Sequence, residues 1–203
     1  MAKRKKTPAP DPAALAKALS GYGTGGTSDI GVGRPVPVLR GDIDMRIARD
    51  GTWFYHGSPI TRKPLVKLFS TVLVRDSDDE YYLVTPVEKC QITVDDAPFV
   101  AVELSVRGGG RNQSLTLRTN VDDRVTVSDS HPVRVTFDPE TAEPSPYVLV
   151  RDRLEALISR PVYYELADIG CEEEVEGDLL FGVWSEGGFF PLGRLGDKVA
   201  ADA

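Results

Sequence analysis

The first hydrophobic pattern in the chain is that of a β-hairpin. Apolar residues alternate with charged ones over residues 43–47, which is the period of a half-buried strand. Asp50-Gly51 follows, a dipeptide typical of a two-residue type I′ turn, whose central residues need positive φ. Residues 52–55 (Thr-Trp-Phe-Tyr) then return as the second predicted strand.

A helix is predicted next. Between Leu65 and Leu73 the apolar residues fall at i, i+1, i+3, i+4, i+7 and i+8, which places them on one broad face. Pro64 suits the first turn of this helix, where a missing backbone N–H costs nothing.

Short apolar runs predict a series of strands after this helix. They lie at residues 81–84, 91–94, 100–106, 115–118, 125–127, 133–137 and 147–150. Gly108 to Gly110 forms a predicted turn, and residues 138–146 form a loop rich in Pro and Glu. Short strands joined by tight turns favour mainly antiparallel sheets.

One spacing of residues occurs twice. Arg62, Leu65, Leu68, Phe69 and Ser70 have the spacing of Arg151, Leu154, Leu157, Ile158 and Ser159. Each set follows a predicted hairpin arm and precedes a pair of tyrosines, Tyr81-Tyr82 or Tyr163-Tyr164. A further strand is expected within residues 179–184, with Gly187-Gly188 turning into Phe189-Phe190. Leucines three apart are ordinary in any amphipathic helix, so the prediction of a repeat depends on the Arg, the Ser and the flanking strands.

These patterns predict an α+β protein. We expect two small domains built from a repeated hairpin–helix–strand unit on mainly antiparallel sheets. Residues 1–40 would form a basic tail, a short helix and a Gly-rich linker, residues 41–106 the first repeat domain, and residues 107–198 the second.

Charge limits the classes of partner. Residues 1–20 carry five basic side chains against Asp11, a net charge of +4. The rest of the chain carries 19 basic and 30 acidic groups, a net charge of −11. Affinity for nucleic acid comes largely from Lys and Arg contacts to phosphate, so we do not expect the folded part to bind nucleic acid. The basic tail is interpreted as a solvated segment, with weak contact to nucleic acid or to an acidic partner as the alternative.

The sequence also predicts a cytoplasmic protein without a membrane partner. No apolar run approaches the length of about 18 residues that a membrane-spanning helix needs. Residues 1–10 lack the apolar core of a secretory signal. The two cysteines, Cys90 and Cys171, are far apart and lack metal-ligand spacing, so neither a disulfide framework nor a cofactor is expected.

Two histidines offer candidate chemistry. His56 lies two residues from Ser58, and a Ser–His pair on one strand face could serve a hydrolase, although no nucleophile-elbow motif accompanies it. The alternative for His56 is a turn histidine bonded to the backbone. His131 precedes Pro132 in a predicted turn, where a structural role is favoured. The carboxylate pairs and the acidic run after Cys171 are interpreted as surface groups.

Arg62 and Arg151 are candidate binding residues, because each opens a predicted helix where a positive charge opposes the helix dipole. Each arginine could pair with a carboxylate of the other unit or with a hairpin carbonyl, or the two could bind an anion between the repeats.

The chain resembles an uncharacterised bacterial family, the domain of unknown function number 1285, over roughly residues 40–195. The likeness is carried by residues 50–60 with Arg62 and 65–69, and by residues 83–88, Asp96-x-Pro98-Phe99, Thr119-Asn120, His131-Pro132 and residues 150–156. The resemblance implies a two-domain α+β fold with repeated motifs and a suggested role in signal transduction. The family has no established catalytic residues.

The favoured functional hypothesis is a non-enzymatic regulatory or signalling module. It would bind a small polar ligand or a protein partner in a cleft between the repeats. The candidate ligand-binding residues are His56, Ser58, Arg62, Thr119, Asn120, His131 and Arg151. The alternatives are a hydrolase that uses His56, and an interaction scaffold whose tail or linker engages a partner.

Overall fold

A computed structural model describes residues 37–194 of the chain. The chain divides into two compact units between Asp95 and Asp96. This division precedes the predicted boundary at residues 106 and 107, because the turn of Gly108 to Gly110 joins two paired strands of one sheet and does not separate domains. The tail, short helix and Gly-rich linker were predicted over residues 1–40, of which residues 1–36 lie outside the described residues.

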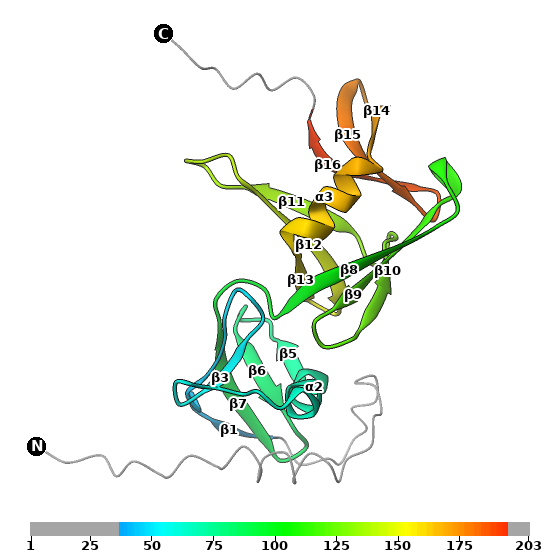
Figure 1. Ribbon diagram of the computed structural model, residues 1–203. Coiled ribbons are helices and arrows are strands. Elements are labelled where there is room, and N and C mark those ends of the chain that lie inside the picture. The colour runs from blue at the N-terminus through cyan, green and yellow to red at the C-terminus, as the bar shows by residue number, and fades with distance from the viewer. Residues whose placement is uncertain (1–36, 195–203) are drawn as a thin grey trace, which may run out of the picture. The chain divides into compact units, whose positions relative to one another are not determined.

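The first unit is a mixed β-sheet with one α-helix, α2 (Lys63–Thr71) (Figure 1). The strand order is β4-β3-β2-β7-β6-β5, with β1 also paired to β7. β7 runs parallel to β1 and β2, and the other neighbours are antiparallel. Its strands are β1 (Val38–Arg40), β2 (Met45–Ile47), β3 (Trp53–Tyr55), β4 (Ser58–Pro59), β5 (Leu73–Arg75), β6 (Tyr81–Val84) and β7 (Glu88–Val94).

The first predicted hairpin is confirmed, but its turn is of a different type. β2 and β3 pair antiparallel, and the N–H of Gly51 donates to the carbonyl of Ala48 at 2.9 Å. Of the predicted turn pair only Gly51 has positive φ, at 81°. A type I turn with a glycine bulge therefore replaces the predicted type I′ turn. Asp50 stabilises it, because its Oδ1 accepts a hydrogen bond of 2.9 Å from the N–H of Thr52.

The predicted helix is also confirmed as α2, with Pro64 in its first turn. Phe69 is fully buried on this helix and stacks on Trp53 of β3, with 6.1 Å between the ring centroids. The helix ends at Thr71, and Leu73 begins β5 instead of extending the apolar face. This aromatic pair anchors α2 to the core of the first unit.

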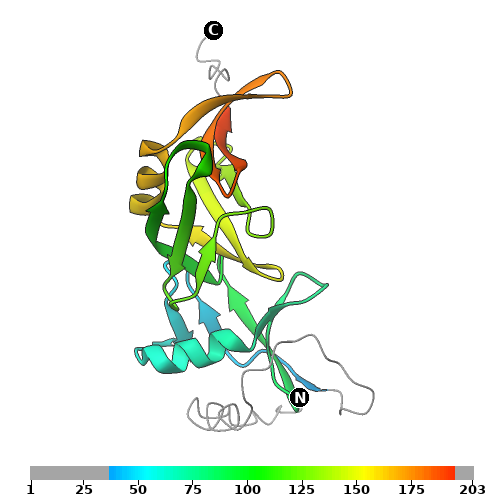
Figure 2. The same ribbon diagram turned by 90° about the vertical axis from the view of Figure 1, so that its right-hand side faces the viewer.

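The second unit contains two sheets and the helix α3 (Arg160–Asp168) (Figures 1 and 2). The larger sheet has the order β10-β9-β8-β13-β12-β11, and the smaller one is an antiparallel β14-β15-β16 sheet. α3 packs against β8 and β15. The strands are β8 (Phe99–Arg107), β9 (Ser114–Thr119), β10 (Arg124–Thr126), β11 (Val133–Phe137), β12 (Pro144–Arg151), β13 (Leu154–Ile158), β14 (Cys171–Val175), β15 (Asp178–Ser185) and β16 (Gly188–Arg194), with a 3₁₀ turn, η1 (Gly110–Asn112), between β8 and β9.

The second predicted helix is wrong. The segment that begins at Arg151 turns at Asp152, where φ is 47°, and continues as β13. Burial alternates along β13, with Leu154 buried and Glu155 half-buried, which is a strand period. The helix α3 begins after Ser159 and carries the two tyrosines predicted to form a strand. The shared spacing therefore falls on a helix in one unit and on a hairpin in the other, so the predicted hairpin–helix–strand repeat is not found.

The two larger sheets nevertheless have the same strand order. Apart from β1, the first three strands of each larger sheet pair antiparallel from the centre of the sheet to one edge, and the next three pair antiparallel from the other edge back to the centre. The sixth strand therefore lies beside the first and parallel to it, as β7 does to β2 and β13 to β8. The helices enter at different points, α2 before β5 and α3 after β13. The two units are thus alike in strand order, and mostly β in content.

Candidate functional site

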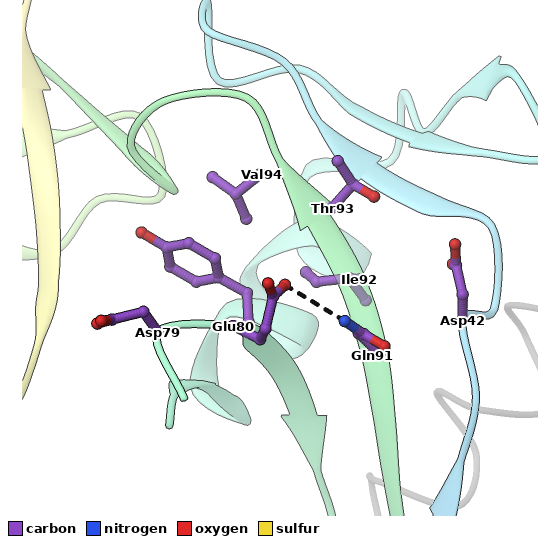
Figure 3. A pocket seen from close by; sticks show the side chains of 8 residues that line it. Asp42, Asp79, Glu80, Gln91, Ile92, Thr93 and Val94 are labelled. Atoms are coloured by element: carbon purple, nitrogen blue, oxygen red, sulfur yellow. Dashed lines mark hydrogen bonds between the residues drawn. The ribbon is translucent and has the colours of Figure 1, made fainter. Parts of the chain in front are cut away.

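A polar concavity of about 310 Å³ lies on the first unit, around the second half of β7 (Figure 3). β7 contributes four consecutive residues, the turn before β6 contributes two carboxylates, and the loop before β2 contributes a third. The lining residues are Asp42, Asp79, Glu80, Tyr81, Gln91, Ile92, Thr93 and Val94. Residues from three separate segments therefore meet at one place on the sheet.

The concavity is acidic. Its lining includes Asp42, Asp79 and Glu80 and no basic side chain. Gln91 donates from Nε2 to Glu80 Oε2 at 3.3 Å, as Figure 3 shows, with Asp42 on the other side of Gln91 in that view. Arg75 Nη2 lies 3.4 Å from Asp79 Oδ1. Three carboxylates with this partial compensation attract a positively charged group.

A hydrogen-bonded turn between β5 and β6 supports this side of the concavity. Tyr82 donates from its hydroxyl to Asp78 Oδ2 at 2.7 Å, and this bond raises the pKa of Tyr82 to about 12. The same bond lowers the pKa of Asp78. Lys89 bonds to Asp76, which lowers the pKa of that carboxyl, and the Lys89 ammonium lies 3.9 Å from the Tyr82 ring centroid. The turn residues are therefore fixed in place beside Asp79 and Glu80.

His56 lies in the turn between β3 and β4. His56 and Gly57 are its two central residues, with φ of 47° and 74°, so this turn is of type I′. The type I′ turn was predicted one hairpin earlier, at Asp50-Gly51. The ring Nδ1 lies 2.9 Å from Asp44 Oδ2, and the backbone N–H donates to the Asp44 carbonyl at 2.9 Å. The predicted common strand face of His56 and Ser58 is wrong, because His56 is part of the turn, whereas Ser58 begins β4 opposite Tyr55 of β3.

Thr119 and Asn120 hold the turn after β9 in the second unit. Thr119 is fully buried, and its hydroxyl accepts a hydrogen bond of 3.1 Å from the N–H of Asp123. Asn120 exchanges two bonds with Val100, accepting at Oδ1 from the Val100 N–H and donating its own N–H to the Val100 carbonyl. Both side chains therefore serve the backbone of the sheet in this structure.

The two candidate arginines have different surroundings. Arg62 is an exposed residue at the N-cap of α2. Arg151 ends β12, places Nη1 2.6 Å from Asp123 Oδ2 and lies 5.0 Å from the Phe99 ring centroid. The predicted carboxylate partner of Arg151 thus exists, but it belongs to the same unit. His131 bonds through Nδ1 to the Leu149 carbonyl of β12 at 3.0 Å.

The contacts of His56, Thr119 and Arg151 each lie within one unit. Thr119 and Arg151 meet at Asp123, whereas His56 pairs with Asp44 in the first unit. The lining of the concavity contains none of the seven predicted residues. Its carboxylates could not be singled out from the sequence, because each occurs in a charged turn or loop of ordinary composition.

The described residues give no support to a metal centre or a membrane span. Between residues 37 and 194, no three His, Cys, Asp or Glu side chains are grouped so that they could hold a metal ion. Within the same range, none of the helices is both long and apolar enough to cross a membrane.

Comparisons with known proteins point to one family. The model of the N-terminal domain of DUF1285, a domain of unknown function, matches residues 32–97, and that of the C-terminal domain matches residues 98–192. A DUF1285 crystal structure from Silicibacter pomeroyi DSS-3 is 50% identical, with a TM-score of 0.77, and the match covers 91% of this chain and 96% of that one. A DUF1285 structure from Shewanella baltica OS155 is 27% identical, with a TM-score of 0.49, over 62% and 91% of the two chains. No protein with a curated description matches the chain.

Proposed function

Because the chain belongs to the DUF1285 family, whose function is unknown, we propose a function from its geometry: the first unit is a non-enzymatic binding module for a small cationic ligand. The observation that carries the proposal is the acidic concavity around β7, with Asp42, Asp79 and Glu80 in its lining. All of its lining residues belong to the first unit, so the proposed site is a different one from the predicted cleft between repeats.

The chemistry of the lining favours an amine or a guanidinium. Carboxylates accept charge-assisted hydrogen bonds from N–H donors, and an aromatic face attracts a cation. Arg75 of the chain already binds in this way beside the concavity, because its guanidinium lies 3.4 Å from Asp79 and 5.6 Å from the Tyr81 ring centroid. The amide of Gln91 and the hydroxyl of Thr93 add neutral hydrogen-bonding groups.

The size of the concavity supports a small ligand. A volume of about 310 Å³ is at the lower end of the range of small-molecule sites. A diamine, a short polyamine or a single basic side chain of a partner has the charge that the lining complements. A regulatory role would then follow from ligand-dependent stabilisation of the β5–β6 turn.

Thermal unfolding with spermidine, arginine, glutamate and a neutral sugar tests this function. A ligand at a hundred times its Kd stabilises the native state by about 2.7 kcal/mol, so the cations should raise Tm by several degrees. The anion and the sugar should leave Tm unchanged. The shift should shrink as salt rises, because exposed charges are screened.

Charge-neutral variants locate the binding. Asp42→Asn combined with Glu80→Gln should abolish the shift in Tm, since both carboxylates line the concavity. The matched control Glu172→Gln combined with Glu174→Gln removes the same charge from exposed positions of the second unit and should keep the shift. Equal loss of the shift in both double variants would show that the cations act through overall charge alone.

A further inference from the structure

His56 presents an oriented and accessible imidazole. The side chain is 48% exposed, and two hydrogen bonds of 2.9 Å fix it to Asp44, one from the ring and one from the backbone. The Tyr55 ring packs beside it, with 4.2 Å between the centroids. Within residues 37–194 the ring nitrogen Nε2 has no hydrogen-bond partner. The ring is therefore held at one nitrogen and open at the other.

The partner of Nδ1 determines the tautomer. An ionised carboxylate only accepts hydrogen bonds, so Nδ1 carries the proton when it bonds to Asp44. The neutral imidazole then has its lone pair on Nε2, the open nitrogen. A carboxylate bonded to one ring nitrogen holds the imidazole in a fixed tautomer and orientation, as the aspartate of a catalytic triad does.

We propose that Nε2 of His56 accepts a phosphoryl group, which makes His56 a modification site of the first unit. Nε2 attacks the phosphorus of an activated donor, an acyl phosphate or a phosphoramidate. The Nε2–P bond forms as the bond from phosphorus to the leaving group breaks. An acyl phosphate releases its carboxylate with that electron pair, and a phosphoramidate, whose nitrogen is protonated in its zwitterionic form, releases ammonia with it. The Nδ1 proton stays on the ring and remains bonded to Asp44, whose negative charge compensates the cationic phosphoimidazolium ring.

His131, the other histidine in the chain, gives an internal comparison. Its Nδ1 bonds to the neutral Leu149 carbonyl at 3.0 Å, which fixes the same tautomer. The side chain is half-buried, and its Nδ1 partner is a carbonyl without a formal charge. The two histidines therefore share one tautomer, but only His56 is exposed and bonded to a carboxylate.

The experiment treats the full-length protein with potassium phosphoramidate. Intact mass spectrometry should find one added phosphate per chain, and ³¹P NMR should show a phosphoramidate signal that is lost in acid and stable in alkali. His56→Asn should abolish the modification. Asparagine is the suitable replacement because it tolerates the positive φ of this turn, and unchanged thermal unfolding would verify the fold. His131→Gln should keep the modification.

Asp44→Asn separates an electronic role of Asp44 from mere accessibility. The amide can donate to Nδ1 and so favour the tautomer with its proton on Nε2, as in a triad with a mutated aspartate. The rate of phosphorylation should then fall by about tenfold or more, while His56 stays exposed. A phosphate that persists in His56→Asn, one that resides on His131, or a rate unchanged in Asp44→Asn would overturn the proposal. The outcome is independent of cation binding in the concavity, which is measured on unmodified protein.

Discussion

Ser185 donates a hydrogen bond from Oγ to the carbonyl oxygen of Val127 at 2.7 Å, and both residues are fully buried. The same Oγ accepts a bond of 3.1 Å from the N–H of Leu115. Leu115 and Val127 are otherwise linked by one direct backbone bond, from the Val127 N–H to the Leu115 carbonyl at 2.8 Å. The hydroxyl of β15 thus joins the smaller sheet of the second unit to the end of the β9–β10 ladder.

Removal of this hydroxyl should be costly. Ser185→Ala leaves a buried N–H and a buried carbonyl without their partner, and we expect a loss of about 1–3 kcal/mol in the free energy of unfolding. Urea denaturation of the wild type and the variant measures the difference. Ser105→Ala, at a half-buried position of β8, is the control and should change stability by less than about 0.5 kcal/mol. Equal effects would contradict a bridging role for Ser185.

Gly182 is required by close packing and not by its φ. A Cβ at this position would lie 2.4 Å from the Phe190 carbonyl oxygen and 2.9 Å from the Pro191 Cα. Gly182→Ala should therefore force backbone movement between β15 and β16 and destabilise the second unit by about 1–3 kcal/mol or more. Gly41→Ala is the matched control, since a Cβ at that position would meet nothing within 4 Å, and it should be nearly neutral. Tm values from calorimetry test the pair.

Tyr82 should make the first unit sensitive to alkaline pH. The pKa of Tyr82 is raised to about 12 by its hydrogen bond to Asp78, so the native state holds this proton more tightly than the unfolded state does. The resulting stabilisation is complete below the ordinary tyrosine pKa of about 10 and is lost as pH rises toward 12. Tyr82→Phe removes this contribution. The difference in stability between wild type and Tyr82→Phe should narrow over that interval, and a constant difference would contradict the assignment.

Local patterns predicted most of the strands and one helix because they recur over several residues, but they missed β1, β5, β13 and β14. The face from Leu65 to Phe69 needs a helix, and the alternation in β2 needs a strand, whatever the tertiary context. The segment from Leu154 to Ile158 is ambiguous, since its leucines fit a helix and its alternation fits a strand. Pairing with β8 and β12 decides it, and β8 is distant in sequence.

The candidate sites show a similar limit. Asp44 is one charged position in an alternating strand pattern, and only the turn at His56 and Gly57 brings the imidazole back to it. The acidic run after Cys171 was interpreted as surface, and it does lie at the surface, with Glu172 and Glu174 exposed on the edge strand β14. Its ion pair, Glu173 with Arg111 at 2.8 Å, was not predicted. In both cases the sequence shows that the residue is charged. Which residue it pairs with depends on how the chain folds back, and no local spacing specifies that.

The shared strand order of the two larger sheets has a consequence for folding kinetics. At the centre of each larger sheet, β1 aside, the strand that comes first in the sequence pairs with the one that comes last, β2 with β7 and β8 with β13. The central pairing therefore joins residues such as Ile47 and Val94, or Ala101 and Ile158. Contacts between such distant residues raise contact order and slow the search for the native state. On the ribosome the hairpins at the edges can form early. Each unit closes only after its last strand has emerged.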